Sequence, residues 1–292
     1  MNRPSFPYLL LAVALLQACA SEGDGTGADG GADAAAVADT DTDVDTDTDT
    51  DTDSDTDTES DTDADSGADS GVDGATRILF IGNSYTYVND LPNRVLAIAE
   101  SIGFAPSVEV ATIASGGARL ADHAANESTM AEIADGGWDY VVLQEQSYLP
   151  IVDPATFYAA AETLAAAALD AGATASLFET WARQEGNDLY TGDLAGYTPE
   201  TMQSALRDAY TEASTLTGAL YLPVGDTWEE TIAAYPSMPL FAADGSHPSQ
   251  HGTYLGACVI FAELTGASLD GAGGVPDGVS EEDGAILRDM AE

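Results

Sequence analysis

Residues 77–92 read RILFIGNSYTYVNDLP, and this stretch decides the fold. Residues 78–81 form a short apolar run rich in β-branched and aromatic side chains, which is typical of a buried strand. The run leads directly into Gly-Asn-Ser, and Asp90 followed by Pro92 indicates the start of a helix. A serine between a strand and the next helix exposes its hydroxyl at the carboxyl edge of the sheet, where open α/β sheets bind their ligands. Ser84 is therefore the first candidate functional residue.

The alternation of strand and helix continues to the end of the chain. Four more strand-like runs cover residues 108–113, 140–143, 175–178 and 220–224. Helical patterns cover residues 91–102, 154–171, 198–217, 250–264 and 281–290. Strands that alternate with helices indicate parallel βαβ units. We therefore expect an α/β fold over residues 77–292, a three-layer α/β/α sandwich around a parallel sheet of about five strands.

The first 18 residues predict export. Arg3 precedes an apolar run over residues 8–16, which is too short to span a bilayer and has the pattern of a secretion signal. The run ends in Leu-Gln-Ala-Cys at Cys19, which resembles the bacterial lipoprotein box and implies cleavage before Cys19 and lipid attachment to its sulfur. The alternative is an ordinary signal peptide with a chance cysteine. Because Ala20 follows the cysteine, the resemblance implies an outer-membrane or cell-surface location in a Gram-negative cell.

Residues 19–76 predict a disordered acidic linker rich in Asp and Thr. From residue 21 onward the segment holds 20 acidic residues and no basic one. It contains too few apolar side chains to offset the entropy of ordering the chain. The first interpretation is a tether that holds the domain away from a membrane. The alternative is calcium binding, because Asp at alternate positions resembles the start of an EF-hand loop, although the turn glycine and the closing Glu are missing.

Composition limits the partners and cross-links of the chain. The 51 acidic residues against 7 basic ones give a formal net charge of −44. Nucleic acid and anionic membrane surfaces would repel such a chain, so neither is an expected partner. The two cysteines are Cys19 and Cys258, and lipidation of the first would leave no intrachain disulfide. Cys258 lies in an apolar helical pattern and is expected in the core. The sequence does not indicate an oligomeric state.

A base for Ser84 is found in the segment FAADGSHPSQHG, residues 241–252. Asp244 precedes His247 by three residues on a tight turn, and we expect a helix to begin at Pro248. This spacing lets the carboxylate accept the imidazole Nδ1 proton, which leaves Nε2 to face the serine. The alternative interpretation makes the aspartate a turn former and the histidine a helix cap.

Together, these two blocks resemble the SGNH (GDSL-like) hydrolase family. The first family block is a strand followed by Gly-Asp/Asn-Ser, here Gly82-Asn83-Ser84, and the last is Asp-x-x-His, here Asp244-Gly245-Ser246-His247. The resemblance spans nearly all of residues 77–292 and implies the flavodoxin-like fold of these hydrolases. It also implies that Ser84 is the nucleophile, His247 the general base and later acid, and Asp244 the orienting carboxylate.

The resemblance further implies donors for the oxyanion that forms during acyl transfer. The backbone N–H of Ser84 is one candidate. The second family block supplies a glycine N–H, and in ATIASGGARL we expect Gly117 in this role, with Gly116 as the alternative. The third block is normally Gly-x-Asn-Asp, but this chain reads LQEQS instead. A glutamine amide has the same donor chemistry on a longer arm, so Gln146 is the candidate and Gln144 the alternative. The GNSYT and LQEQS blocks indicate a side branch of the family.

Three other side chains are candidates for substrate binding. His123 follows the glycine pair and is placed to reach a substrate oxygen, although an exposed helix histidine is the alternative. Trp181 and Arg183 follow the fourth strand at the carboxyl edge, where ligands bind. Arg183 is suited to a carboxylate or a sugar hydroxyl, and its alternative role is a salt bridge to one of the many acids.

A metal site is the remaining alternative for the histidines. His247 and His251 lie four residues apart, which on one helix face is the spacing of a metal pair. However, Pro248 places His247 before the helix, and the HExxH glutamate is absent. We therefore expect neither a metal nor a cofactor.

These features favour an extracytoplasmic, lipid-anchored serine esterase. O-acetyl groups on carbohydrate are the expected substrates by family resemblance, while small lipid or aryl esters remain open. The alternative is a non-catalytic cell-surface binding module that retains the fold, which the missing Asn of the third block favours.

Overall fold

The structure, a computed structural model, describes residues 74–292. The signal sequence, Cys19 and nearly all of the acidic linker lie outside the described residues, so export, lipidation and calcium binding stay predictions. Within residues 74–292, no helix is long and apolar enough to cross a membrane.

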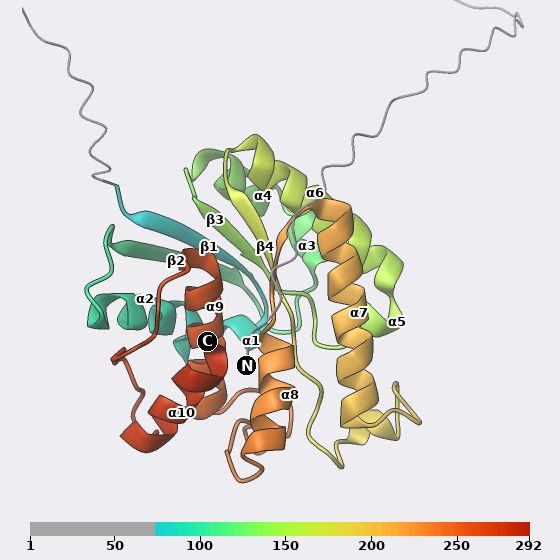
Figure 1. Ribbon diagram of the computed structural model, residues 1–292. Helices are drawn as coiled ribbons and strands as arrows, with labels where there is room; N and C mark the ends of the chain where they lie inside the picture. Colours follow the sequence, from blue (N-terminus) through green and yellow to red (C-terminus); the bar gives the residue numbers. More distant parts are fainter. Residues whose placement is uncertain (1–73) are drawn as a thin grey trace, which may run out of the picture. The chain divides into compact units, whose positions relative to one another are not determined.

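A parallel sheet of five strands forms the centre of the domain, in the order β2-β1-β3-β4-β5 (Figure 1). The strands are β1 (Thr76–Gly82), β2 (Val108–Ala114), β3 (Tyr140–Leu143), β4 (Thr174–Phe178) and β5 (Leu220–Leu222). The predicted α/β fold with a central parallel sheet is confirmed. The last strand is shorter than predicted because Pro223 follows it and helix α8 begins at Val224.

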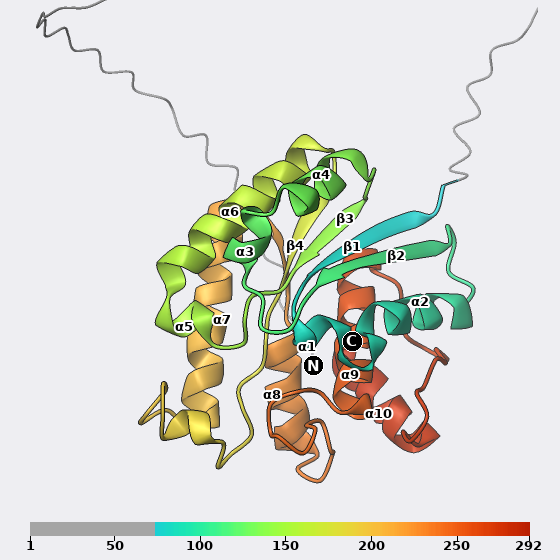
Figure 2. The same cartoon turned by 180° about the vertical axis from the view of Figure 1, so that it is seen from behind.

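Helices cover both faces of the sheet, as Figures 1 and 2 show from opposite sides. One face packs against α2 (Leu91–Ser101), α8 (Val224–Ala234), α9 (Gln250–Thr265) and α10 (Glu281–Ala291). The other packs against α3 (Leu120–Ala124), α4 (Glu127–Asp135), α5 (Leu149–Val152), α6 (Pro154–Asp170) and α7 (Pro199–Thr217). Three short pieces complete the fold: α1 (Ser84–Tyr87), η1 (Val88–Asp90) and η2 (Asp188–Tyr190).

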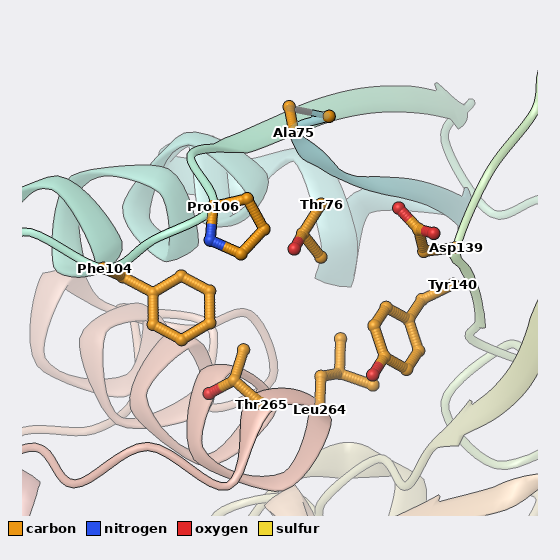
Figure 3. A pocket seen from close by; sticks show the side chains of 9 residues that line it. Ala75, Thr76, Phe104, Pro106, Asp139, Tyr140, Leu264 and Thr265 are labelled. Atoms are coloured by element: carbon orange, nitrogen blue, oxygen red, sulfur yellow. The ribbon is translucent and has the colours of Figure 1, made fainter. Parts of the chain in front are cut away.

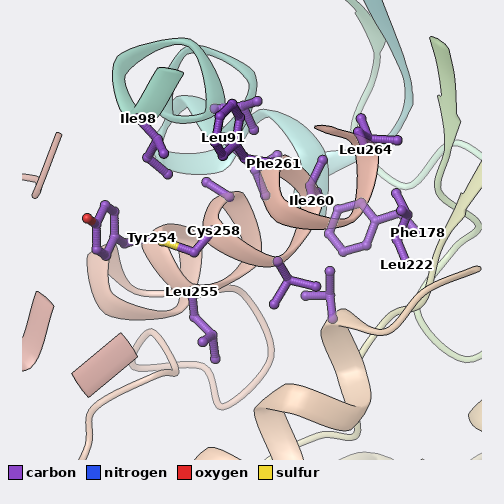
Figure 4. Close-up of a cluster of buried hydrophobic side chains, with 14 of the residues drawn as sticks. Leu91, Ile98, Phe178, Leu222, Tyr254, Leu255, Cys258, Ile260, Phe261 and Leu264 are labelled. Carbon is purple, nitrogen blue, oxygen red and sulfur yellow. The ribbon is translucent and has the colours of Figure 1, made fainter. Parts of the chain in front are cut away.

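The two core layers arise from the alternation of side chains along the strands. In β1, Ile78 and Phe80 belong to one buried cluster, and Leu79 and Ile81 belong to the other. A strand buried on both faces is apolar at every position, which explains the continuous apolar run in the sequence. Figure 4 shows part of the first cluster, where α9 packs its side chains against the sheet and α2. Cys258 is fully buried there, as predicted.

The strand order determines where a ligand can bind. In a sheet of this order the chain turns from one side to the other between β1 and β3, and the carboxyl ends of these strands form a crevice. Ser84 directly follows β1, and the LQEQS block directly follows β3. The two blocks therefore meet at the switch point of the sheet.

Candidate active site

A short, well-anchored turn carries Ser84 at the carboxyl end of β1. Ser84 is the first residue of α1, and the side chain of Asn83 caps this helix by accepting the N–H of Tyr85 at 3.1 Å. The amide of Asn83 also donates to the carbonyl of Ala118 at 3.0 Å. Asn83 is buried, so both ends of its side chain fix the direction in which the serine hydroxyl points.

His247 and Asp244 complete a hydrogen-bonded chain that starts at this serine. The Oγ atom of Ser84 lies 2.9 Å from His247 Nε2, and His247 Nδ1 lies 2.6 Å from Asp244 Oδ2. The other carboxylate oxygen accepts the backbone N–H groups of Ser246 and His247, each at 2.9 Å. With Asp244 ionised, Nδ1 carries the imidazole proton, which leaves Nε2 to accept the serine proton. The arrangement has the geometry of an activated serine nucleophile.

The surroundings of Asp244 keep it ionised. Partial burial alone would raise its pKa, but the hydrogen bonds from the His247 ring and from two backbone N–H groups outweigh this effect. Together they hold the pKa of the Asp244 carboxyl below its usual value. Asp244 is therefore charged throughout the neutral range, where it stabilises a protonated imidazole.

The helix after His247 begins where the predicted helical pattern 250–264 begins, two residues after the start expected at Pro248. It starts at Gln250, because the hydroxyl of Ser249 caps the N–H groups of His251 and Gly252. Pro248 instead forms an isolated antiparallel bridge with Phe241, which closes the loop that carries the acid and the base.

Asn89 joins the segment after Ser84 to the segment after His247. Its backbone is left-handed, with φ of 56°, a conformation that Asn tolerates better than most residues. Its amide donates to the carbonyl of Pro248 at 2.9 Å and to the hydroxyl of Thr253 at 3.0 Å. Sequence analysis missed this contact, because side-chain bonds between distant segments leave no local pattern.

Two of the predicted oxyanion donors remain free to bind a ligand. Gly116 and Gly117 follow β2 on an exposed loop, and neither backbone N–H donates to an acceptor within residues 74–292. The amide oxygen of Gln146 accepts the N–H groups of Tyr148 and Leu149 at 3.1 and 3.2 Å. These bonds orient the side chain and leave its Nε2 without a partner among the described residues.

Gln144, the alternative donor, has a different role. Its side chain is fully buried, and its amide oxygen accepts the N–H of Asn83 at 3.0 Å and the hydroxyl of Thr86 at 2.8 Å. Its amide nitrogen donates to the carbonyl of Glu145. Both the oxygen and the nitrogen of this buried amide thus form bonds beneath the serine turn, so Gln144 positions that turn and does not face the substrate. A Cβ at Gly82 would lie only 2.6 Å from the Gln144 amide oxygen, so this position requires glycine.

Glu145 is a buried acid that joins the second and third blocks. Its side chain is 1% exposed, and one carboxylate oxygen accepts the N–H of Leu120 at 3.2 Å and of Gln146 at 2.6 Å. Burial raises the pKa of Glu145 to about 7, although these hydrogen bonds partly oppose the shift. The native protein thus binds a proton that the unfolded chain releases between pH 4.5 and 7.

We expect Glu145→Gln to stabilise the protein at alkaline pH. Because the native-state pKa is raised, stability falls as the pH rises from about 4.5 to about 7, and the charged form remains unfavourable above that. Glutamine keeps an acceptor for both N–H groups without the charge. At pH 8 the variant should be more stable than the native protein by up to about 3 kcal/mol, and at about pH 4 the two should be nearly equal. Urea unfolding at both pH values checks this, and equal stability at pH 8 contradicts it.

His123 does not reach the substrate side of the site. Its side chain is buried, and its Nε2 lies 2.8 Å from the carbonyl oxygen of Gly82. It therefore supports the end of β1 from within the core. The predicted substrate contact and its alternative, an exposed helix histidine, are both wrong.

Trp181 is a core residue and not a substrate contact. It is 1% exposed and stacks in parallel with Tyr85 at 4.4 Å and with Trp228 at 4.1 Å between ring centroids. Its indole N–H donates to the carbonyl of Ser246 at 2.9 Å. Tyr85 in turn bonds the hydroxyl of Ser246 at 2.9 Å and meets the His247 ring edge-on at 5.5 Å. The stack supports the histidine loop, and Tyr85 is a site residue that sequence analysis missed although it lies in the GNSYT block.

Arg183 lies at the carboxyl edge, as predicted. Its Nη2 donates to the hydroxyl of Ser147 at 2.7 Å, and its guanidinium carbon lies 5.7 Å from the centroid of the Tyr85 ring. The predicted alternative was a salt bridge. It is wrong, because no carboxylate among residues 74–292 pairs with Arg183.

The third histidine belongs to helix packing. His251 Nε2 lies 3.3 Å from Asp283 Oδ2, which joins α9 to α10. Among the described residues, no group of three His, Cys, Asp or Glu side chains is placed to hold a metal ion.

Two cavities of the domain lie apart from the serine. One of about 330 Å³ lies at the amino ends of β1 and β3, where Thr76 and Tyr140 line it, at the edge opposite Ser84 (Figure 3). The other, of about 740 Å³, lies between α7, α8 and residues 182–185. Ser84 and His247 line neither of them. Their surroundings are open, because the His247 side chain is 35% exposed and that of Asp244 is 50% exposed.

Comparison with known proteins identifies the family. The sequence matches no family model and no curated protein. A solved structure from Slackia heliotrinireducens, assigned to the SGNH hydrolases, is similar with 33% sequence identity and a TM-score of 0.57, over 65% of this chain and 100% of that one. A DUF4886 family protein from Bacteroides uniformis has 19% identity and a TM-score of 0.61, over 75% of this chain and 93% of that one. An acetyl xylan esterase has 12% identity and a TM-score of 0.51, over 64% and 98% of the two chains. The full coverage of the first relative, together with its identity, shows that this chain belongs to the SGNH hydrolase family.

Proposed function

We propose that the protein is a serine esterase that hydrolyses carboxylic esters through an acyl-enzyme. The observation that carries this proposal is the contact of Ser84 Oγ with His247 Nε2 at 2.9 Å, continued to Asp244 at 2.6 Å. Membership of a hydrolase family supports the reaction type.

The reaction proceeds in two matched halves. Ser84 Oγ attacks the ester carbonyl carbon while its proton passes to His247 Nε2, and Asp244 stabilises the resulting imidazolium. When the tetrahedral intermediate collapses, the C–O bond to the alcohol breaks and Nε2 returns the proton to the leaving oxygen. A water molecule then attacks the acyl-enzyme with the same histidine as base, which releases the acid and restores Ser84.

Three donors are the ones that we propose for the oxyanion in both halves. They are the N–H of Ser84, the N–H of Gly117 or Gly116, and Nε2 of Gln146. The support for this set is that each glycine N–H and the Gln146 amide nitrogen lack a protein acceptor among residues 74–292. Gln146 would thus take the part of the Asn that is usual in the family.

O-acetyl groups on carbohydrate are the substrates that we propose. The triad is open to solvent, which admits a polymer, and an acetyl xylan esterase shares the fold. We also propose that the acidic tether and a lipid on Cys19 hold the domain outside the cytoplasm, where such polymers occur.

We expect a fluorophosphonate probe to label Ser84 and the protein not to prefer long acyl groups. At an open surface a long acyl chain buries little apolar area, so kcat/KM for p-nitrophenyl octanoate should not exceed that for the acetate. Acetate release from acetylated xylan tests the natural class of substrate. A folded protein that neither takes up the probe nor hydrolyses any of these esters would favour the non-catalytic binding module.

A further inference from the structure

Arg183 carries a positive charge that the protein itself does not neutralise. Arg77, Arg119 and Arg207 pair with carboxylates, whereas Arg183, like Arg94 and Arg288, forms no ion pair among residues 74–292. Within residues 74–292, no carboxylate oxygen lies within 4.0 Å of the Arg183 guanidinium. A shortage of acids does not explain this, because the chain has 51 acidic residues and 7 basic ones.

Most of the hydrogen-bonding capacity of Arg183 is also unused. A guanidinium has five N–H donors. In Arg183 only one of them forms a hydrogen bond to the described residues, from Nη2 to Ser147 Oγ. The Nε atom is buried and has no hydrogen-bond partner. A buried charged donor without a partner is unfavourable unless a ligand satisfies it.

The position of Arg183 connects it to the serine site. Trp181 stacks on the Tyr85 ring, and the guanidinium carbon of Arg183 lies 5.7 Å from the centroid of the same ring. Tyr85 directly follows Ser84 in the chain, and its ring contacts that of His247. The hydrogen-bonded Ser147 directly follows Gln146. Arg183 thus contacts residues next to both the nucleophile and the proposed oxyanion donor.

We infer that Arg183 binds a carboxylate on the alcohol part of the substrate, so that the preferred ester is an acetylated acidic sugar. Nη1–H and the second N–H of Nη2 form a planar fork that matches the two oxygens of a carboxylate. The inference rests on the proposed esterase function, because it assigns the substrate class of that site. A purely structural role of Arg183, as support for Tyr85 and Ser147, is the rival explanation.

The test uses two substrates that differ only in the charged group: acetylated methyl glucoside, with a CH₂OH group at C5, and acetylated methyl glucuronoside, with a carboxylate there. The native protein should prefer the glucuronoside, and Arg183→Gln should lower the ratio of the two kcat/KM values by roughly 10- to 100-fold, the effect of a lost hydrogen-bonded charge. Arg183→Lys should keep part of the preference, because it keeps the charge but not the fork. As a control, Arg77→Gln removes the same charge from the opposite edge of the sheet and should leave the ratio unchanged.

A binding measurement separates this inference from the esterase proposal. In Ser84→Ala, calorimetry with methyl glucuronoside should show binding that Arg183→Gln weakens about tenfold or more. Equal losses on both sugar esters, a native preference for the glucoside, or no binding of the glucuronoside would overturn the inference. If one of these three contrary results appears while p-nitrophenyl acetate is still hydrolysed, the esterase proposal stands and only the proposed substrate class is wrong. If no ester is hydrolysed but the glucuronoside binds through Arg183, the subsite stands and the esterase proposal fails.

Discussion

Ser84→Ala is expected to lower kcat for p-nitrophenyl acetate by roughly 10⁴- to 10⁶-fold. The variant removes the oxygen that forms the acyl bond, and the neighbouring donors retain only the residual catalysis of substrate binding and oxyanion stabilisation. His247→Ala should lower kcat by a similar factor, because without Nε2 at 2.9 Å the hydroxyl keeps its proton and is a poor nucleophile.

The double variant shows whether the two residues act as one unit. If they do, Ser84→Ala combined with His247→Ala should be no less active than either single variant, since the first loss already disables the whole unit. Stopped assays with purified protein provide the rates. A separate thermal unfolding measurement first shows that each variant has a native fold. Additive losses, or an active Ser84→Ala variant, would mean that another group is the nucleophile.

His251→Ala is a matched control for the histidine. His251 also pairs with an aspartate, but it joins α9 to α10 and does not touch Ser84. Its removal should leave kcat within about threefold of the native value, because the bond that it makes to Asp283 lies outside the serine site. A large loss of kcat in this variant would show that general damage, and not chemistry, explains the effect of His247→Ala.

The strands were the most predictable part of the fold. Residues 140–143 were predicted as a strand and form β3 with the same limits, because an apolar run in an α/β domain has no other simple interpretation. Helix α4 was missed because it buries only Thr129 and Ile133, so its apolar stripe is too sparse to stand out. Helix α8 was missed because Val224 reads as the end of a strand and Trp228 lies alone among acids.

The candidate site was predictable where short spacing brings residues together. Asp244 and His247 lie on one tight turn, so their contact follows from the sequence once the turn is recognised. The direction of a side chain after a strand does not follow in this way. Gln144 and Gln146 have the same chemistry two residues apart, yet the missing Cβ of Gly82 lets Gln144 turn inward, while Gln146 stays at the rim. Trp181 was misread for the same reason, since its stack joins three distant segments.

Asp244→Asn is the second large effect that we expect, a fall in kcat of roughly 10³- to 10⁴-fold with little change in KM. The Asn oxygen can still accept the backbone N–H groups of Ser246 and His247, so the loop should keep its shape. Its NH₂ group would then face His247 Nδ1, which must become the acceptor. The imidazole proton moves to Nε2, where it blocks transfer of the proton from Ser84. The labelling rate of Ser84 by the fluorophosphonate should fall in parallel with kcat.

The free energy of unfolding, measured against pH for the native protein and for Asp244→Asn, gives a second test of the charge on Asp244. Because the pKa of Asp244 is lowered on folding, its contribution to stability is present above the unfolded-state pKa, near 3.9, and is lost as the pH falls through the lower native value. Asp244→Asn should therefore be less stable than the native protein at pH 7, and this difference should shrink as the pH falls below the unfolded-state pKa.

Asp283→Asn distinguishes the chemical role of Asp244 from its charge. Asp283 also has a lowered pKa and also faces a histidine ring, with hydrogen bonds from Ser280 and His251 as the leading causes. The two substitutions remove the same charge from the same kind of pair, but only Asp244 is connected to Ser84 through its histidine. A loss of kcat confined to Asp244→Asn therefore reports the imidazole tautomer, whereas equal losses in both variants would attribute the effect to net charge and contradict the proposed triad.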